Sequence, residues 1–123
     1  MALADSAEHA AALGYALNTR AEILASLKRY ADARESAERS LAAYYSGSPS
    51  LGRADSLTAW SLNVMFLGEA DIAEGRAEDA LRRFSEILER ARRTNTLRGQ
   101  AQTLLAIGRA QEALGRQRRG GGA

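Results

Sequence analysis

Apolar residues recur along most of this chain at steps of three and four positions, which is the period of an amphipathic helix. The pattern is clearest over residues 77–94, where it runs through Ala80, Phe84, Leu88 and Ala91. The same period predicts four more helices, over about residues 5–28, from Tyr30 to just before Ser46, over about 54–74 and over about 97–114. The predicted fold class is therefore all-α, with antiparallel neighbours because the connections are short.

Three sequence signals set the expected helix ends. Asp5 begins D-S-A-E, a capping box in which Glu8 reaches back to the N-cap residue. Gly75 and Gly115 are the expected C-terminal stops, because glycine takes the left-handed conformation at low cost. Thr94 to Thr96 interrupts the apolar stripe and offers a cap for the last helix.

One internal loop is expected at Ser46–Arg53, which is rich in Gly and Ser and contains the only proline. Neither side of this loop carries enough apolar residues for a core of its own, so residues 1–115 are predicted to form a single domain. Residues 116–123, RQRRGGGA, have no apolar side chain apart from the final Ala. They are predicted to be a disordered basic tail.

Small residues recur at matched places in the predicted helices. Ala33 and Ala80 are 47 residues apart, and the same offset relates Ala21 to Gly68; a further 40 residues lead from Gly68 to Gly108. Equal spacing of small residues is expected where helices cross closely. A period in this range is typical of solenoids built from helix pairs.

These residues resemble the pattern of the tetratricopeptide repeat family, in which a hairpin of two helices carries W-x₂-L-G-x₂-Y and A-x₃-F. Val64, Leu67, Gly68, Ala80 and Phe84 stand for that pattern in the central copy. The resemblance covers about residues 13–115 and implies an α-solenoid of antiparallel hairpins with about five helices, or two and a half repeats. It implies a non-catalytic module or scaffold that binds another protein or a peptide.

Three departures from the family pattern accompany this resemblance. The repeat is longer than the usual length of about 34 residues. Arg20 stands where leucine is expected, and Asp71 stands where a large aromatic residue is expected. A carboxylate at a helix contact needs a partner or water, so Asp71 is expected to pair with Arg82, Arg83 or a neighbouring helix. A binding role for Asp71 is the alternative.

In the family, the first helices of successive hairpins line a concave groove that holds a helix or an extended peptide. The resemblance therefore implies a partner-binding surface made of Tyr15, Asn18, Glu22, Leu62, Met65, Glu69, Gln102, Leu105 and Arg109. Some family members clamp a carboxylate in this groove. Glu22 and Glu69 stand where such a clamp needs neutral groups, so no clamp is expected. The alternative for Leu62, Met65 and Leu105 is packing between repeats.

The predicted last helix has no following helix to cover its apolar stripe. This exposed stripe favours self-association, for example as a homodimer, unless the chain is a fragment or its tail shields the stripe.

Composition narrows the functional classes. The chain contains no cysteine, which excludes disulfides and thiolate metal sites and fits a reducing compartment such as the cytoplasm. No apolar run approaches the length of about 20 residues that spans a membrane.

His9 is the only histidine and is expected to be exposed, so a metal site, a bound cofactor or a Cys/His nucleophile pair is not expected. Nothing positions a nucleophile near Glu22 or Glu69, so catalysis is not expected.

Charge supports an alternative function. The net charge is +2, but residues 76–123 hold eleven basic and five acidic residues. The arginines that could contact phosphates in a nucleic-acid-associated transcriptional regulator are Arg92, Arg93, Arg98 and those of the stretch from Arg116 to Arg119. Glu86 and Glu89 in the same region, and the lack of stacking aromatic residues beyond Phe84, argue against direct binding to nucleic acid.

Overall fold

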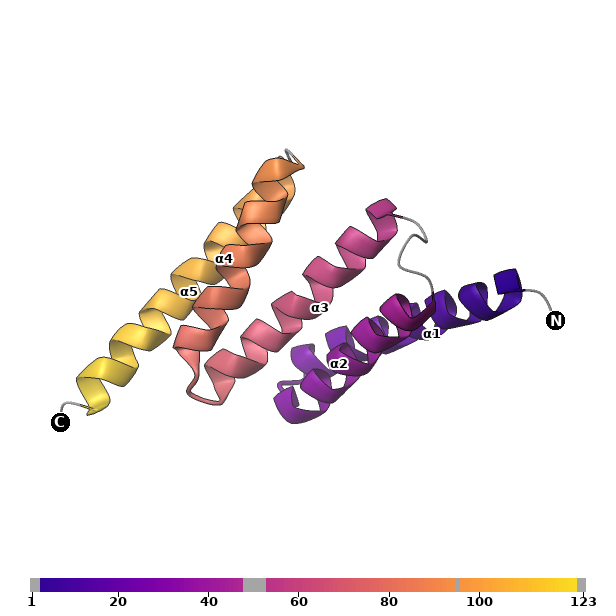
Figure 1. Cartoon of the computed structure of the whole chain (residues 1–123). Coiled ribbons are helices and arrows are strands. Elements are labelled where there is room, and N and C mark those ends of the chain that lie inside the picture. The colour runs from indigo at the N-terminus through magenta and orange to yellow at the C-terminus, as the bar shows by residue number, and fades with distance from the viewer. Residues whose placement is uncertain (1–2, 48–52, 95, 122–123) are drawn as a thin grey trace. The chain divides into compact units, whose positions relative to one another are not determined.

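The computed structural model describes residues 3–47, 53–94 and 96–121 (Figure 1). These residues form α-helices and no strand, which confirms the all-α class. The helices are α1 (Leu3–Ser26), α2 (Tyr30–Gly47), α3 (Arg53–Ala73), α4 (Ala77–Arg93) and α5 (Leu97–Gly121). The chain divides into two compact units, residues 1–67 and 68–123, and α3 contributes to both. The prediction of one repeat domain over 1–115 stays a prediction.

Two predicted helix ends are wrong. Helix α1 begins at Leu3, so Asp5 lies inside the helix and not at its N-cap. Helix α5 does not stop at Gly115 but continues to Gly121, so residues 116–121 of the expected disordered tail are helical. The side chain of Gln117 donates a hydrogen bond to the Gly75 carbonyl and ties this extension to the start of α4. Of the expected loop, residues 48–52 lie outside the described part of the chain.

The turns after α1 and α3 have the same backbone geometry. Lys28 and Gly75 both have positive φ, 62° and 79°. The N–H that follows each of them donates to a carbonyl five residues back, Arg29 to Leu24 at 2.8 Å and Arg76 to Asp71 at 2.7 Å. This is the Schellman motif, which satisfies carbonyls that a helix end would otherwise leave unpaired. The two turns are 47 residues apart, so the offset seen in the sequence is also an offset in local structure.

Unit 1 is built on the pair α1 and α2, which lie side by side (Figure 1). The two helices approach closely at Gly14, where an added Cβ would lie 2.8 Å from the ring of Tyr44. The buried residues Ala21, Ala37, Phe66 and Leu67 form an apolar cluster that joins this pair to α3. The alanines let the backbones of α1 and α2 approach each other, and α3 supplies the large side chains of the cluster, Phe66 and Leu67.

A chain of buried polar groups also joins the three helices of unit 1. Asn18 donates to the side-chain oxygen of Asn63 at 2.9 Å, and Asn63 donates to the Ser40 hydroxyl at 2.9 Å. Ser40 in turn donates to the backbone carbonyl of Gly14 at 2.6 Å. Asn63 and Ser40 are 0% exposed. Because an unpaired amide in this position would be costly, these bonds fix the register of α3 against α1 and α2.

Unit 2 contains a tight contact between α3 and α4. Phe84 of α4 is 0% exposed, and its ring lies over Gly68 of α3. A Cβ on Gly68 would lie 2.2 Å from Cε1 and 2.5 Å from Cζ of this ring, so no side chain fits there. Ala80, one turn earlier in α4, is also 0% exposed. Gly68 and Ala80 are both buried, as the sequence predicts, and Gly68 lies at a contact between α3 and α4.

Helix α5 packs beside α4 through small side chains (Figure 1). Its buried face consists of Thr103, Ala106, Ala110 and Ala113. The sequence-based stripe was different, because Leu97 and Leu104 are 77% and 50% exposed. An uncovered apolar face on the last helix is thus confirmed, and small residues, not leucines, face α4.

The Gly68 contact generates a prediction with a matched control. Gly68→Ala should lower the free energy of unfolding by about 1–3 kcal/mol, because the new methyl overlaps the Phe84 ring. Gly108→Ala makes the same change in another helix, where nothing lies within 4 Å of the added Cβ. It should raise stability by about 0.5–1 kcal/mol through helix propensity alone. Urea unfolding followed by circular dichroism measures both, and equal effects at the two sites would contradict the packing described.

Candidate protein-recognition surfaces

The structure brings two of the nine predicted residues together in unit 2. Glu69 of α3 and Arg109 of α5 form an ion pair at 4.0 Å. The Glu69 side chain is 31% exposed and the Arg109 side chain 56% exposed. Both belong to helices that the repeat pattern treats as equivalent first helices. The pair thus links the C-terminal part of α3 to α5 through two long side chains.

Burial changes the acidity of Glu69. Its pKa is raised above the ordinary value of 4.5 because the carboxylate loses solvation, and the positive charge of Arg109 opposes this shift. Desolvation is the larger effect. A partially desolvated carboxylate beside an exposed guanidinium is a polar pair that a ligand could engage through hydrogen bonds.

Leucine and amide side chains extend this surface along α5. Gln102 and Leu105 precede Arg109 by seven and four residues, so all three lie on one face of the helix. Leu105 is 66% exposed, and Gln102 is also exposed. We call Glu69, Gln102, Leu105 and Arg109 the α3–α5 surface. It combines an exposed apolar side chain with charged and amide groups.

Unit 1 has a second set of predicted residues, which differ in exposure. Tyr15 is 69% exposed and Leu62 is 41% exposed, Glu22 is exposed, and Met65 is half-buried. Tyr15 and Glu22 lie about one turn on either side of Asn18 on α1. A ligand could therefore contact Tyr15, Leu62 and Glu22 fully and Met65 only in part.

Asn18 does not belong to an open surface. Its side chain is only 9% exposed and donates to Asn63 of α3. Asn18, which the sequence places on the binding surface, is thus nearly buried in unit 1. The reason is that α3 supplies a buried amide partner at this height of α1. Sequence reasoning missed Asn63, although an asparagine inside the apolar run LNVMFL was the signal that could have found it.

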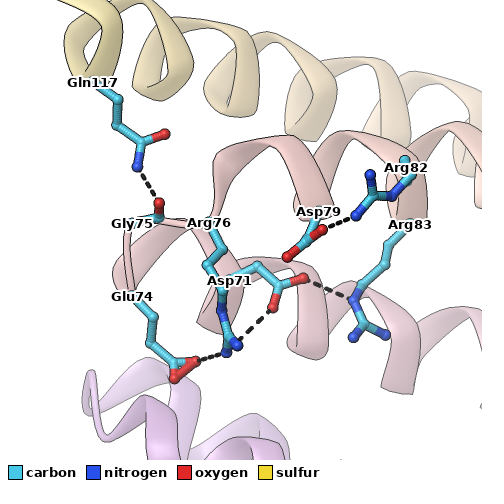
Figure 2. Close-up of polar contacts among 8 residues, drawn as sticks. All are labelled: Asp71, Glu74, Gly75, Arg76, Asp79, Arg82, Arg83 and Gln117. Carbon is cyan, nitrogen blue, oxygen red and sulfur yellow. Dashed lines mark hydrogen bonds and ion pairs between the residues drawn. The ribbon is translucent and has the colours of Figure 1, made fainter. Parts of the chain in front are cut away.

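Asp71 lies in a cluster of charges at the turn between α3 and α4, shown in Figure 2. Its side chain is 2% exposed, and it accepts a hydrogen bond from Nε of Arg83 at 2.7 Å. Arg76 approaches the other carboxylate oxygen at 3.8 Å and also pairs with Glu74 at 2.7 Å. The expected pairing of Asp71 with Arg83 is confirmed. Arg82, the other candidate, pairs with Asp79 instead.

The described residues offer little that could hold a metal. They contain no group of three or more His, Asp and Glu side chains placed for a metal ion. His9 is exposed, as the sequence predicts. No helix among the described residues has the length and apolar character needed to cross a membrane.

Comparison with known proteins gave no relative from which a role could be transferred. No protein-family model matches the chain, and no curated protein or solved structure matches it either.

Adjacent arginines on α4 give a matched test of the buried charge cluster. Arg83→Met should lower the free energy of unfolding by about 1–3 kcal/mol, because it removes the hydrogen bond and the positive charge that Arg83 provides to the buried Asp71 carboxylate. Arg82→Met removes an exposed pair, since the Arg82 side chain is 72% exposed, and should cost less than about 1 kcal/mol. Chemical unfolding of both variants checks this order. Equal losses would mean that Asp71 does not depend on Arg83.

Glu69 predicts a specific pH dependence. Because its folded pKa is raised, the folded state binds this proton more tightly than the unfolded state, and stability falls as pH rises from 4.5 through the folded pKa. Glu69→Gln should match the parent below pH 4.5 and become more stable than the parent above the window. Urea unfolding from acidic to neutral pH measures this difference.

Arg109→Ala is the control for this assignment, because the positive charge of Arg109 lowers the pKa of Glu69 and so opposes the effect of burial. Its removal should raise the pKa of Glu69 further, which carboxyl NMR titration detects. A Glu69 pKa at or below 4.5 in the parent protein would contradict the burial of this side chain.

Proposed function

We propose that this protein is a non-catalytic recognition module that binds a peptide or helix of another protein, in the manner of tetratricopeptide repeats. In this proposal the helical hairpins are repeated structural units, and the first helix of each presents residues to the partner. The α3–α5 surface is the main part of the proposed binding site.

The observation that supports the repeat is the pair of equivalent turns. Lys28 and Gly75 end α1 and α3 with the same Schellman hydrogen bonds. The helices that follow carry the fully buried alanines Ala33 and Ala80 at equal distances from the turns. Two hairpins with the same turn and the same small contact residue are what a helical repeat requires.

The chemistry of the α3–α5 surface supports a protein partner. Peptide recognition needs exposed apolar anchors beside groups that fix orientation by hydrogen bonds. Leu105 supplies the anchor, and Gln102, Glu69 and Arg109 supply donors and acceptors. Both charges occur in the surface, so a partner with a mixed polar and apolar sequence suits it.

The alternative, a nucleic-acid-associated regulator, draws on the arginines of α4 and α5. Most arginines of α4 are paired with carboxylates, for example Arg90 with Glu86 at 3.7 Å and Arg93 with Glu89 at 3.7 Å. Such i,i+4 pairs neutralise the positive charge that phosphate binding needs. This pairing favours the protein-recognition proposal over direct phosphate contact.

Selection of peptides from a displayed random library on the purified chain tests the proposal. Leu105→Ala should weaken the selected peptides at least tenfold, as truncation of a central anchor does. Leu97→Ala is the control, because it is the same change at an exposed leucine on another face of α5. It should leave the affinity unchanged. A library that yields no binders, or equal effects of the two variants, would contradict the proposal.

Nuclease treatment separates the two functions. Protein partners that co-purify from lysate should remain bound after nuclease digestion if recognition is direct. If every bound component is lost on digestion, the nucleic-acid alternative is correct.

A further inference from the structure

Helix α5 presents an apolar stripe on a different side from its buried face. Leu97, Ala101, Leu104 and Gly108 follow one another at steps of four, three and four, so they share one face of the helix, and all four are exposed. We call these four residues the α5 outer stripe. Its two leucines are 77% and 50% exposed. The stripe therefore presents large apolar side chains to the surroundings of the protein.

Arginines stand at both ends of the α5 outer stripe. Arg98 follows Leu97 directly in the sequence. Arg119 lies three helical turns beyond Gly108, so it continues the line of the stripe, and Arg118 is its neighbour. These three arginines are exposed, and none of them forms an ion pair with another described residue. At about 1.5 Å of rise per residue, the positive charges at the two ends are separated by about 30 Å.

The other charges on and beside α5 cancel in pairs. Arg116 pairs with Glu112 at 3.1 Å, and Arg109 pairs with Glu69 of α3 at 4.0 Å. Glu112 is the only acid in the sequence of α5. The helix is therefore left with an apolar stripe and with three positive charges in excess at its ends. The surface that complements it is apolar in its interior and negatively charged at its boundary.

A lipid surface with anionic headgroups has this combination of properties. A helix that lies flat on such a surface places leucines at the boundary between headgroups and acyl chains. Arginine side chains beside them extend to the lipid phosphates, because their long apolar stems keep the guanidinium in the polar layer. A planar surface contacts both ends of α5 at once and needs no groove to receive the helix.

Two other occupants fit the stripe less well. Nucleic acid offers phosphates but no apolar medium for the leucines, and the sequence of α5 contains no aromatic residue that could stack on bases. A second α5 from another copy would bring arginines near arginines in either direction of pairing, because both ends of the stripe are positive. The excess charge therefore favours the lipid surface.

We propose that the α5 outer stripe attaches this protein to an anionic lipid surface. The two leucines of the stripe enter the boundary between headgroups and acyl chains, and the three unpaired arginines contact lipid phosphates. The attachment is peripheral and reversible, because a surface helix is held far less firmly than a helix that spans the membrane. Leu105 and Arg109 are not needed for it, so it is independent of the proposed peptide recognition.

Flotation of the full chain with lipid vesicles tests the attachment. The chain should bind vesicles that contain phosphatidylglycerol and not vesicles of pure phosphatidylcholine, and added salt should release it. The double variant Arg118→Gln/Arg119→Gln should lower the partition coefficient about 25-fold, since each arginine near the surface contributes about fivefold. Arg20→Gln/Arg39→Gln is the matched control, because it removes two exposed charges from α1 and α2. It should lower the coefficient less than about threefold, since charges away from the contact are screened.

Single spin labels test whether the stripe enters the lipid. The chain contains no cysteine, so Leu104→Cys and Leu27→Cys each give one labelling site. On phosphatidylglycerol vesicles, the label at position 104 should be shielded from a water-soluble nickel quencher. The label at position 27, where the leucine is 61% exposed on α1, should stay accessible. Circular dichroism should show the helix content of the parent in both variants, and equal accessibility of the two labels would overturn the proposal.

A chain that does not float with phosphatidylglycerol vesicles at low salt overturns the proposal, whatever else it binds. Binding to duplex DNA in that case identifies nucleic acid as the occupant of the stripe. A dimer that Leu104→Ala abolishes identifies a second copy of the chain. Leu104→Ala should leave the affinity for peptides that depend on Leu105 unchanged, so failure of lipid binding is distinct from failure of peptide recognition.

Discussion

The close contact between Gly68 and the ring of Phe84 is the constraint on which the structure of unit 2 depends. Since no Cβ fits at Gly68, the backbone of α3 can approach the aromatic ring and bury it completely. That approach sets the distance between the two helices. The hydrogen bond from Arg83 to Asp71 joins the same two helices. Packing and charge pairing thus act together on α3 and α4.

Unit 1 reaches a related arrangement with different chemistry. At the 47-residue offset in the sequence, Ala21 corresponds to Gly68 and Ala37 corresponds to Phe84. Neither alanine can fix the helix positions by its shape alone. Buried hydrogen bonds take over this role through Asn18, Asn63 and Ser40. Polar networks of this kind are costly if incomplete, and so they specify one register of the helices. The two units contain the same kind of turn but differ in what holds their helices together.

Sequence reasoning found the parts of the fold that depend on local signals. Periodicity located every helix, and the recurrence of small residues at the 47-residue offset identified the buried Gly68 and Ala80. It failed where a partner distant in the sequence decides the outcome. Asn18 is removed from the surface by Asn63, and α5 passes Gly115 while Gln117 bonds to Gly75. On α5 the buried face is formed by Ala106, Ala110 and Ala113, whereas Leu97, Leu104 and Leu105 are exposed, so contact geometry and not hydrophobicity determines which side faces inward.

A double-mutant cycle on Gly68 and Phe84 tests the central constraint most directly. If the ring is what excludes a side chain at Gly68, then shortening it with Phe84→Leu should remove most of the cost of Gly68→Ala. The free energies of unfolding of the four proteins should then show a favourable coupling of about 1 kcal/mol or more. Additive effects of the two changes would contradict this account, because they would mean that the residues do not share one packed space.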